Sequence, residues 1–126
     1  MGVQFDASSE YEVARCVAAG VLPEKISLST QEFPTVFPEG VRFNACSLYQ
    51  LRRFGELYPG QYVGIRINPG IGSGSHSKTT VGGPSSSFGI WHELLPDICS
   101  IASTFNLTIN AIHMHIGSGN DSTLWV

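Results

Sequence analysis

Short runs of alternating apolar and polar residues recur along the chain. Alternation with a period of two is typical of β-strands that bury one face. The runs occupy residues 3–7, 26–29, 41–46, 62–68 and 107–116. In the fourth run the apolar residues are Val63, Ile65 and Ile67, and Arg66 stands among the polar ones. We therefore predict five strands, each with one polar face.

Segments with the features of helices separate these runs, over 10–19, between residues 47 and 60, and over 92–105. Ser9 and Ser47 each precede a helix, and Glu12 and Gln50 follow three residues later, which is the spacing of a capping box. Pro96 is compatible with the third helix only in its first turn. Strands that alternate with helices predict βαβ units and a parallel sheet, which is an α/β fold.

The connection over residues 30–40 contains two prolines, Pro34 and Pro38, and leaves room for barely one helical turn. A connection between parallel strands usually carries a helix. We therefore expect a shortened or irregular helix in this stretch.

The polar strand faces indicate how the sheet is arranged. Parallel strands covered by helices on both faces are near-continuous apolar runs, whereas these strands alternate. The pattern favours a closed barrel whose lumen holds a polar ligand, and an open sheet with one solvated face is the alternative. In a (β/α)8 barrel the functional residues lie at the carboxyl ends of the strands. Asp6, Asn68 and His115 stand at such ends.

Composition excludes several classes of protein. The chain has 126 residues, a formal net charge of −3 and 13% charged residues, against about a quarter in average soluble domains. This balance argues against a nucleic-acid-binding protein, and the 42% hydrophobic content argues against disorder. No apolar run approaches the ~18 residues of a membrane span, and no signal peptide is recognisable. Three widely spaced cysteines predict reduced thiols in a cytoplasmic protein.

The stretch from His113 to Gly119 holds the densest candidate chemistry. A Gly-Ser-Gly sequence between a strand and a helix lets backbone N–H groups approach an anion, although alone it is more often a turn. His113 and His115 share a strand face, so they could ligate a metal ion. No further histidine or carboxylate cluster joins them, and for His113 a packed core histidine is an equal alternative.

Three other features have competing interpretations. Asp6 would point into the lumen and needs a cation or a protonated ring as its partner there, and a salt bridge to Arg66 across the barrel is a plausible structural role. Glu12 is better explained by the capping box than by ligand binding, although both roles are compatible. The glycine- and serine-rich segment 68–89 is long for a connection, which favours a lid over the site.

Five motifs, taken together and in order, resemble one enzyme family. They are Phe-Asp-Ala-Ser-Ser-Glu-Tyr-Glu (5–12), Phe-Asn-Ala-Cys-Ser (43–47), Ile-Arg-Ile-Asn-Pro-Gly (65–70), Ser-Ser-Phe-Gly-Ile (86–90) and His-Met-His-Ile-Gly-Ser-Gly (113–119). The combination resembles the barrel domain of the diaminopimelate decarboxylases, within the fold-type III decarboxylases that depend on pyridoxal 5′-phosphate. The similarity covers essentially the whole chain.

The resemblance implies decarboxylation of meso-2,6-diaminopimelate to L-lysine, with pyridoxal 5′-phosphate as the electron sink. By resemblance, His115 stacks on the pyridine ring, and Ser118 with its two flanking glycines forms part of the phosphate cradle. The further cofactor-binding residues that the resemblance implies are Asp6, Glu12 and Arg66, the cradle glycines are Gly117 and Gly119, and no metal is implied.

Two departures from the family pattern limit this interpretation. Ser87 stands where the family usually has a lysine before Phe-Gly. The lysine that forms the Schiff base in the family has no counterpart here, because neither Lys25 nor Lys78 lies in its motif. We therefore expect residues 1–126 to be a partial barrel, strands two to six of eight, without a second domain and inactive alone, from a parent that forms homodimers.

Other functions remain open from the sequence. Family members acting on ornithine, arginine or carboxynorspermidine share this barrel. A metal-dependent barrel hydrolase using His113 and His115, or a non-catalytic remnant with an interaction role, are the rival classes.

Overall fold

The computed structural model describes residues 2–35, 37, 39–69 and 89–115. In chain order the strands and α-helices are β1 (Phe5–Ala7), α1 (Glu10–Ala18), β2 (Ile26–Leu28), β3 (Arg42–Ala45), α2 (Leu48–Leu57), β4 (Tyr62–Asn68), β5 (Ile90–Trp91), α4 (Leu95–Phe105) and β6 (Thr108–Met114). Short 3₁₀ turns at Pro23–Lys25 and His92–Leu94 precede β2 and α4. None of the helices within these residues has the length and apolar character to span a bilayer.

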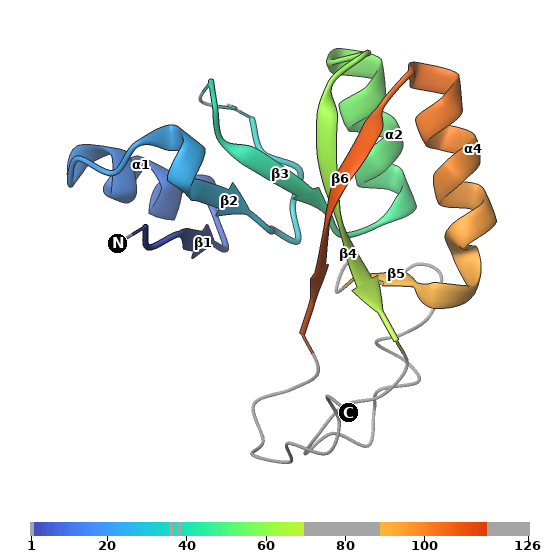
Figure 1. The fold of residues 1–126 in the computed structure, drawn as a ribbon, viewed down its shortest axis with the longest axis horizontal. Helices are drawn as coiled ribbons and strands as arrows, with labels where there is room; N and C mark the ends of the chain where they lie inside the picture. Colours follow the sequence, from blue (N-terminus) through green and yellow to red (C-terminus); the bar gives the residue numbers. More distant parts are fainter. Residues whose placement is uncertain (1, 36, 38, 70–88, 116–126) are drawn as a thin grey trace.

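All strand pairs are parallel, and the neighbours run β1-β2-β3-β4, with β6 on the other side of β4 (Figure 1). β5 pairs with the carboxyl end of β4, through Ile67 and Asn68. The predicted α/β fold with a parallel sheet is therefore confirmed. β5 escaped the sequence analysis because two residues are too short to show a period.

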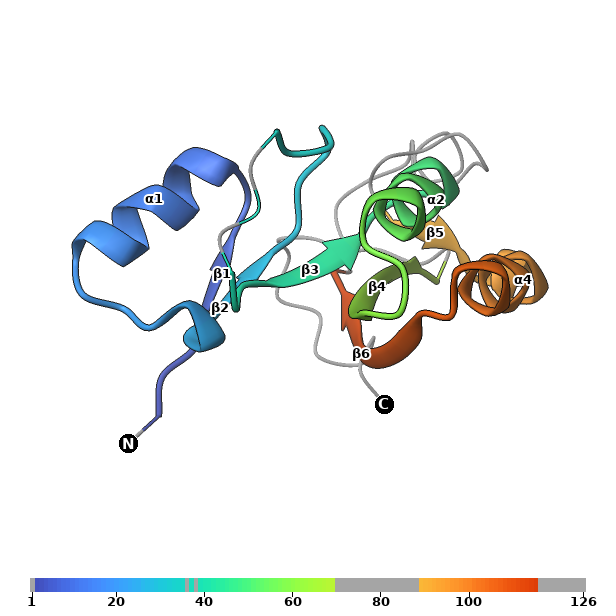
Figure 2. The same ribbon diagram turned by 90° about the horizontal axis from the view of Figure 1, so that it is seen from above.

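The helices lie on one side of the sheet (Figure 2), and the apolar strand residues face them. Ile26, Leu28, Phe43 and Ile65 are almost completely buried in this layer. α2 and α4 pack side by side where Gly55 meets the ring of Phe105. The opposite, helix-free face carries the polar residues of the strands, and we call it the inner face.

Both predicted helix caps form, each with one difference. Ser9 Oγ accepts from the backbone N–H of Glu12 at 3.2 Å, and Ser47 Oγ accepts from that of Gln50 at 3.1 Å. The return bond of a capping box goes to the N-cap residue. In this chain the return bond reaches the residue before the N-cap instead. Glu12 accepts from the Ser8 N–H at 2.7 Å, and Gln50 accepts from the Cys46 N–H at 2.8 Å.

The expectation of a short helix over residues 30–40 is wrong for the part of the stretch that is described, which forms bends and a turn. Aromatic side chains cover the sheet there instead. The Phe37 ring lies 5.1 Å from that of Phe43 and 5.8 Å from that of Phe54. Gln50 Nε2 holds the start of the stretch, donating to the carbonyls of Thr30 at 2.8 Å and Gln31 at 3.0 Å.

The sheet curls strongly towards its inner face. At ~4.8 Å per strand, β1 and β6 would lie about 19 Å apart in a flat sheet with three strands between them. Yet His113 Nε2 on β6 lies 3.1 Å from Asp6 Oδ2 on β1. A contact between opposite edges across this face requires a curved sheet, which is the geometry of a barrel segment.

Candidate functional site

The inner face gathers polar side chains at and near the carboxyl ends of its strands. The parallel register places Asp6 beside Ser27 and Arg66 beside His113. Asn44 lies beside Gly64 on the same face. In barrels built from parallel strands this end carries the ligand site.

Asp6 is the centre of a hydrogen-bond network on this face. Its Oδ1 accepts from Ser27 Oγ at 2.9 Å and from Ser29 Oγ at 3.2 Å, and its Oδ2 lies 3.1 Å from His113 Nε2. Burial tends to raise the pKa of Asp6, but the hydrogen bonds from His113 and the two hydroxyls outweigh it. The pKa of this carboxyl is therefore below its usual value, and Asp6 is ionised at neutral pH.

The network continues to β3 through Asn44, which is buried. Asn44 Nδ2 donates to Ser29 Oγ at 3.0 Å. A Cβ on Gly64 would overlap the Asn44 amide oxygen, so β4 needs glycine at this point. Hydrogen bonds thus link β6, β1, the end of β2 and β3 across one face.

Arg66 does not pair with Asp6, contrary to the expectation from the sequence. Asp6 takes His113 as its hydrogen-bond partner, and Arg66 lies beside the Cys46 thiol. Burial raises the pKa of Cys46, and the positive charge of Arg66 only partly opposes this. The expected salt bridge fails because Arg66 sits on the central strand β4, whereas His113 on the edge strand β6 reaches across to β1.

Three buried side-chain nitrogens in the described part of the chain have no hydrogen-bond partner. They are Nε of Arg42, Nε of Arg66 and Nδ1 of His113. All three residues belong to the inner face, on β3, β4 and β6. A buried polar group without a partner costs about 1–3 kcal/mol. Such a cost concentrated on one face is typical of a site whose ligand supplies the missing partners.

The predicted site residues do not all meet. Asp6 and Arg66 lie on the inner face, and His115 follows β6 directly and is exposed. Glu12 is exposed in the first turn of α1, where hydrogen bonds from the Ser8 N–H and hydroxyl lower the pKa of its carboxyl. Glu12 therefore has the predicted capping role, and its part in cofactor binding stays a prediction. The predicted cradle Gly117, Ser118 and Gly119 lies outside the described residues, as do Ser87 and almost all of the expected lid.

Ser27, Ser29 and Cys46 were not predicted as site residues from the sequence. The two serines share the face of Asp6 by strand alternation, so this signal was present in the sequence. For the metal alternative, no group of three His, Cys, Asp or Glu side chains that could hold an ion is found among residues 2–35, 37, 39–69 and 89–115.

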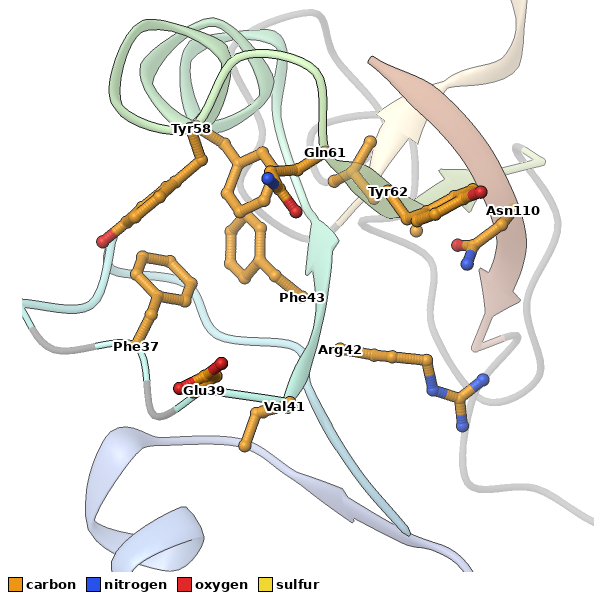
Figure 3. A pocket seen from close by; sticks show the side chains of 13 residues that line it. Phe37, Glu39, Val41, Arg42, Phe43, Tyr58, Gln61, Tyr62 and Asn110 are labelled. Carbon is orange, nitrogen blue, oxygen red and sulfur yellow. The ribbon is translucent and has the colours of Figure 1, made fainter. Parts of the chain in front are cut away.

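A cleft of about 470 Å³ lies at the opposite, amino-terminal end of the strands (Figure 3). β3 pairs with β2 through Arg42 and Phe43 but with β4 only through its last two residues, so the starts of β3 and β4 separate. Phe43, Tyr58 and Tyr62 line the gap. We favour the inner face as the functional site, because parallel α/β folds bind ligands at the carboxyl ends of their strands.

Comparison with known proteins identifies the family. Residues 1–124 match the model of the pyridoxal-dependent decarboxylase, pyridoxal binding domain. The chain is 39% identical to the diaminopimelate decarboxylase of Streptomyces coelicolor over 95% of its own length and 29% of that protein. It is 37% identical to the Escherichia coli diaminopimelate decarboxylase, over 95% of the chain and 31% of the relative.

A crystal structure of a diaminopimelate decarboxylase superposes with a TM-score of 0.78 at 34% identity, covering 98% of this chain and 31% of that one. The chain thus spans about a third of the length of the relatives it matches. The fold, the inner face and these similarities agree, and the chain belongs to the pyridoxal-dependent decarboxylase family, within its pyridoxal binding domain.

Proposed function

We propose that this chain is the pyridoxal 5′-phosphate-binding part of a decarboxylase that converts meso-2,6-diaminopimelate to L-lysine. One observation carries the proposal: the family match over residues 1–124 coincides with an inner face whose polar groups gather towards the carboxyl strand ends. The substrate assignment rests on the named relatives, which are diaminopimelate decarboxylases.

The residues of the inner face fit such a cofactor. Arg66 Nε is a buried N–H donor without a partner, and an anionic, oxygen-rich ligand would supply an acceptor for it. The residues that would hold the cofactor, as the resemblance implies, are Asp6, Glu12, Arg66 and His115, together with the Gly117–Gly119 stretch. When bound, the cofactor supplies an electron sink for the carbanion left by loss of carbon dioxide.

The residues of this chain would bind the cofactor and orient the side chains around it. Asp6 is ionised, and the hydroxyls of Ser27 and Ser29 fix its carboxylate. Asp6 in turn fixes the ring of His113 through Nε2. The curled sheet thereby holds β6 in place just before His115.

We further propose that residues 1–126 are an incomplete barrel that does not decarboxylate alone. Lys25 ends the 3₁₀ turn at the amino end of β2, away from the candidate site, and Lys78 is outside the described residues. The remaining barrel strands, the lysine and a partner subunit would come from a longer homodimeric protein. The free thiols of Cys16, Cys46 and Cys99 support a reducing, cytoplasmic setting.

The covalent part of the proposal is tested on the chain itself. Pyridoxal 5′-phosphate is added, borohydride is used to fix any lysine adduct, and peptides are mapped by mass spectrometry. We expect saturable binding without stoichiometric labelling of Lys25 or Lys78. Stoichiometric labelling of either lysine would overturn the proposal that the chain lacks the functional lysine.

The substrate is tested in a chimaera in which this chain replaces the matching segment of the Escherichia coli enzyme. We expect carbon dioxide release from meso-diaminopimelate and none from ornithine or arginine. A folded chimaera that releases carbon dioxide only from ornithine or arginine would refute the substrate assignment.

A further inference from the structure

The two ring nitrogens of His113 differ in their surroundings. Nε2 lies 3.1 Å from Asp6 Oδ2, whereas Nδ1 is buried without a hydrogen-bond partner among the described residues. A ring nitrogen of histidine donates when it carries a hydrogen and accepts when it does not. What Nδ1 can bind therefore depends on which nitrogen carries the hydrogen, that is, on the tautomer of the ring.

All side-chain hydrogen bonds around Asp6 are directed towards its carboxylate. Asn44 Nδ2 donates to Ser29 Oγ at 3.0 Å, so the hydroxyl hydrogen of Ser29 is left to donate to Asp6 Oδ1 at 3.2 Å. Ser27 Oγ donates to the same oxygen at 2.9 Å. An ionised carboxylate accepts hydrogen bonds and has no hydrogen to give. The hydrogen between Asp6 Oδ2 and His113 is therefore on Nε2.

This arrangement makes Nδ1 of the neutral ring an acceptor. With its single hydrogen on Nε2, the imidazole of His113 has a lone pair on Nδ1. A carboxylate that accepts from one ring nitrogen raises the basicity of the other, so Asp6 strengthens this acceptor. The His113 side chain keeps 27% of its surface exposed, so a ligand on the inner face can approach the ring.

We propose that Asp6 fixes His113 in the tautomer with hydrogen on Nε2, and that Nδ1 then accepts a hydrogen bond from an ammonium group of the ligand. His113 is the binding residue, and Asp6 is its positioning residue. An ammonium group has three N–H donors and a positive charge, which complements the negative charge of the Asp6–His113 pair. That this ammonium group belongs to diaminopimelate rests on the proposed function, whereas the tautomer does not.

The tautomer is observed directly from the imidazole ¹⁵N resonances of the labelled chain. They are recorded at pH 8, which favours the neutral form of histidine, and the resonances of His113 are those that disappear in His113→Gln. We expect hydrogen on Nε2 and a lone pair on Nδ1. A ring with its hydrogen on Nδ1, or with hydrogens on both nitrogens, would overturn the proposal.

The variant Asp6→Asn should reverse the tautomer. Because Ser27 and Ser29 donate to the Oδ1 position, the asparagine oxygen takes that position and its NH₂ group faces Nε2 of the ring. Nε2 must then accept, and the hydrogen moves to Nδ1, as in catalytic triads whose aspartate is replaced by asparagine. Glu32→Gln removes an exposed negative charge elsewhere and should leave the tautomer unchanged. If Asp6→Asn keeps its hydrogen on Nε2, Asp6 does not control the ring.

Three related probes test the ligand. They are meso-diaminopimelate, pimelate, which lacks the two amino groups, and 1,5-diaminopentane, which lacks the two carboxylates. We expect diaminopimelate and 1,5-diaminopentane to move the Nδ1 resonance of His113 saturably to lower frequency, and pimelate to leave it in place. In Asp6→Asn and in His113→Gln the affinity for diaminopimelate should fall about tenfold, which corresponds to one hydrogen bond.

Failure of this inference and failure of the proposed function give different results. If diaminopimelate shifts backbone amides saturably while Nδ1 does not move, the inference is overturned and the proposed function stands. If 1,5-diaminopentane moves Nδ1 while diaminopimelate does not bind, the ammonium site stands and the substrate assignment fails.

Arg66 provides the internal alternative to a ligand. It is the register partner of His113, and its Nε–H is also without a partner. If Arg66→Gln moves the Nδ1 resonance of the free chain and no amine moves it, Arg66 is the donor to Nδ1 and the ammonium site is refuted.

Discussion

Asp6 has three side-chain hydrogen-bond partners, and they come from two distant segments of the chain, the end of β2 and β6. Because these bonds lower the pKa of Asp6 in the folded state, the ionised carboxylate stabilises the fold above the unfolded pKa of about 3.9. That contribution is lost as the pH falls through the folded value, that is, below about pH 4.

The Asp6→Asn variant tests this linkage. At pH 7 we expect it to unfold at lower urea than the parent chain, and at pH 3 the two should differ less. Glu32→Gln, which removes one exposed negative charge elsewhere, is the control. A difference between Asp6→Asn and parent that grows towards pH 3 would contradict the assignment of a lowered pKa to Asp6.

The three cysteines should differ in reactivity. Cys46 is 1% exposed and burial raises the pKa of its thiol, whereas Cys99 is exposed on α4. The thiolate is the reactive form, so a thiol reagent at neutral pH should label Cys99 first and Cys46 only after unfolding. Peptide mapping over time measures this order. If Cys46 were labelled as fast as Cys99, the thiol at the end of β3 would be accessible to solvent, and its burial would be refuted.

At the scale of elements, α2 and α4 are held together where Gly55 lies against Phe105. A Cβ at residue 55 would lie 2.5 Å from the Phe105 ring. Gly55→Ala should therefore destabilise the chain by about 1–3 kcal/mol in urea unfolding, although alanine favours a helix more than glycine. In a Phe105→Leu background the cost should shrink, and an equal cost in both backgrounds would refute this packing account.

The elements that the sequence predicts are those with local signals. Ser9 and Ser47 mark the helix starts because capping involves residues three or four apart. Pro96 falls in the first turn of α4, as its missing N–H requires. Two features have no such local signal. They are the aromatic cover that Phe33 and Phe37 form in place of a helix, and the two-residue strand β5. Both depend on partners elsewhere in the fold.

The candidate site was predictable only in part, for the same reason. Strand alternation indicated the polar face and placed Asp6 and Arg66 on it. It could not indicate that Asp6 pairs with His113, which is 107 residues away, rather than with Arg66. That choice depends on how far the sheet curls, which is a property of all its strands together.

In the whole molecule, the curled parallel sheet offers its inner face as the proposed ligand site. The cleft between the starts of β3 and β4 is the competing location, at the other end of the strands. Both regions lie within the same chain, so a single measurement can compare them.

That measurement is a map of backbone amide shifts as pyridoxal 5′-phosphate is added to the chain. We expect the largest changes at the carboxyl strand ends, around Ala7, Cys46 and His113. Changes centred on Phe43, Tyr58 and Tyr62 of the cleft, or no saturable change at any residue, would contradict it.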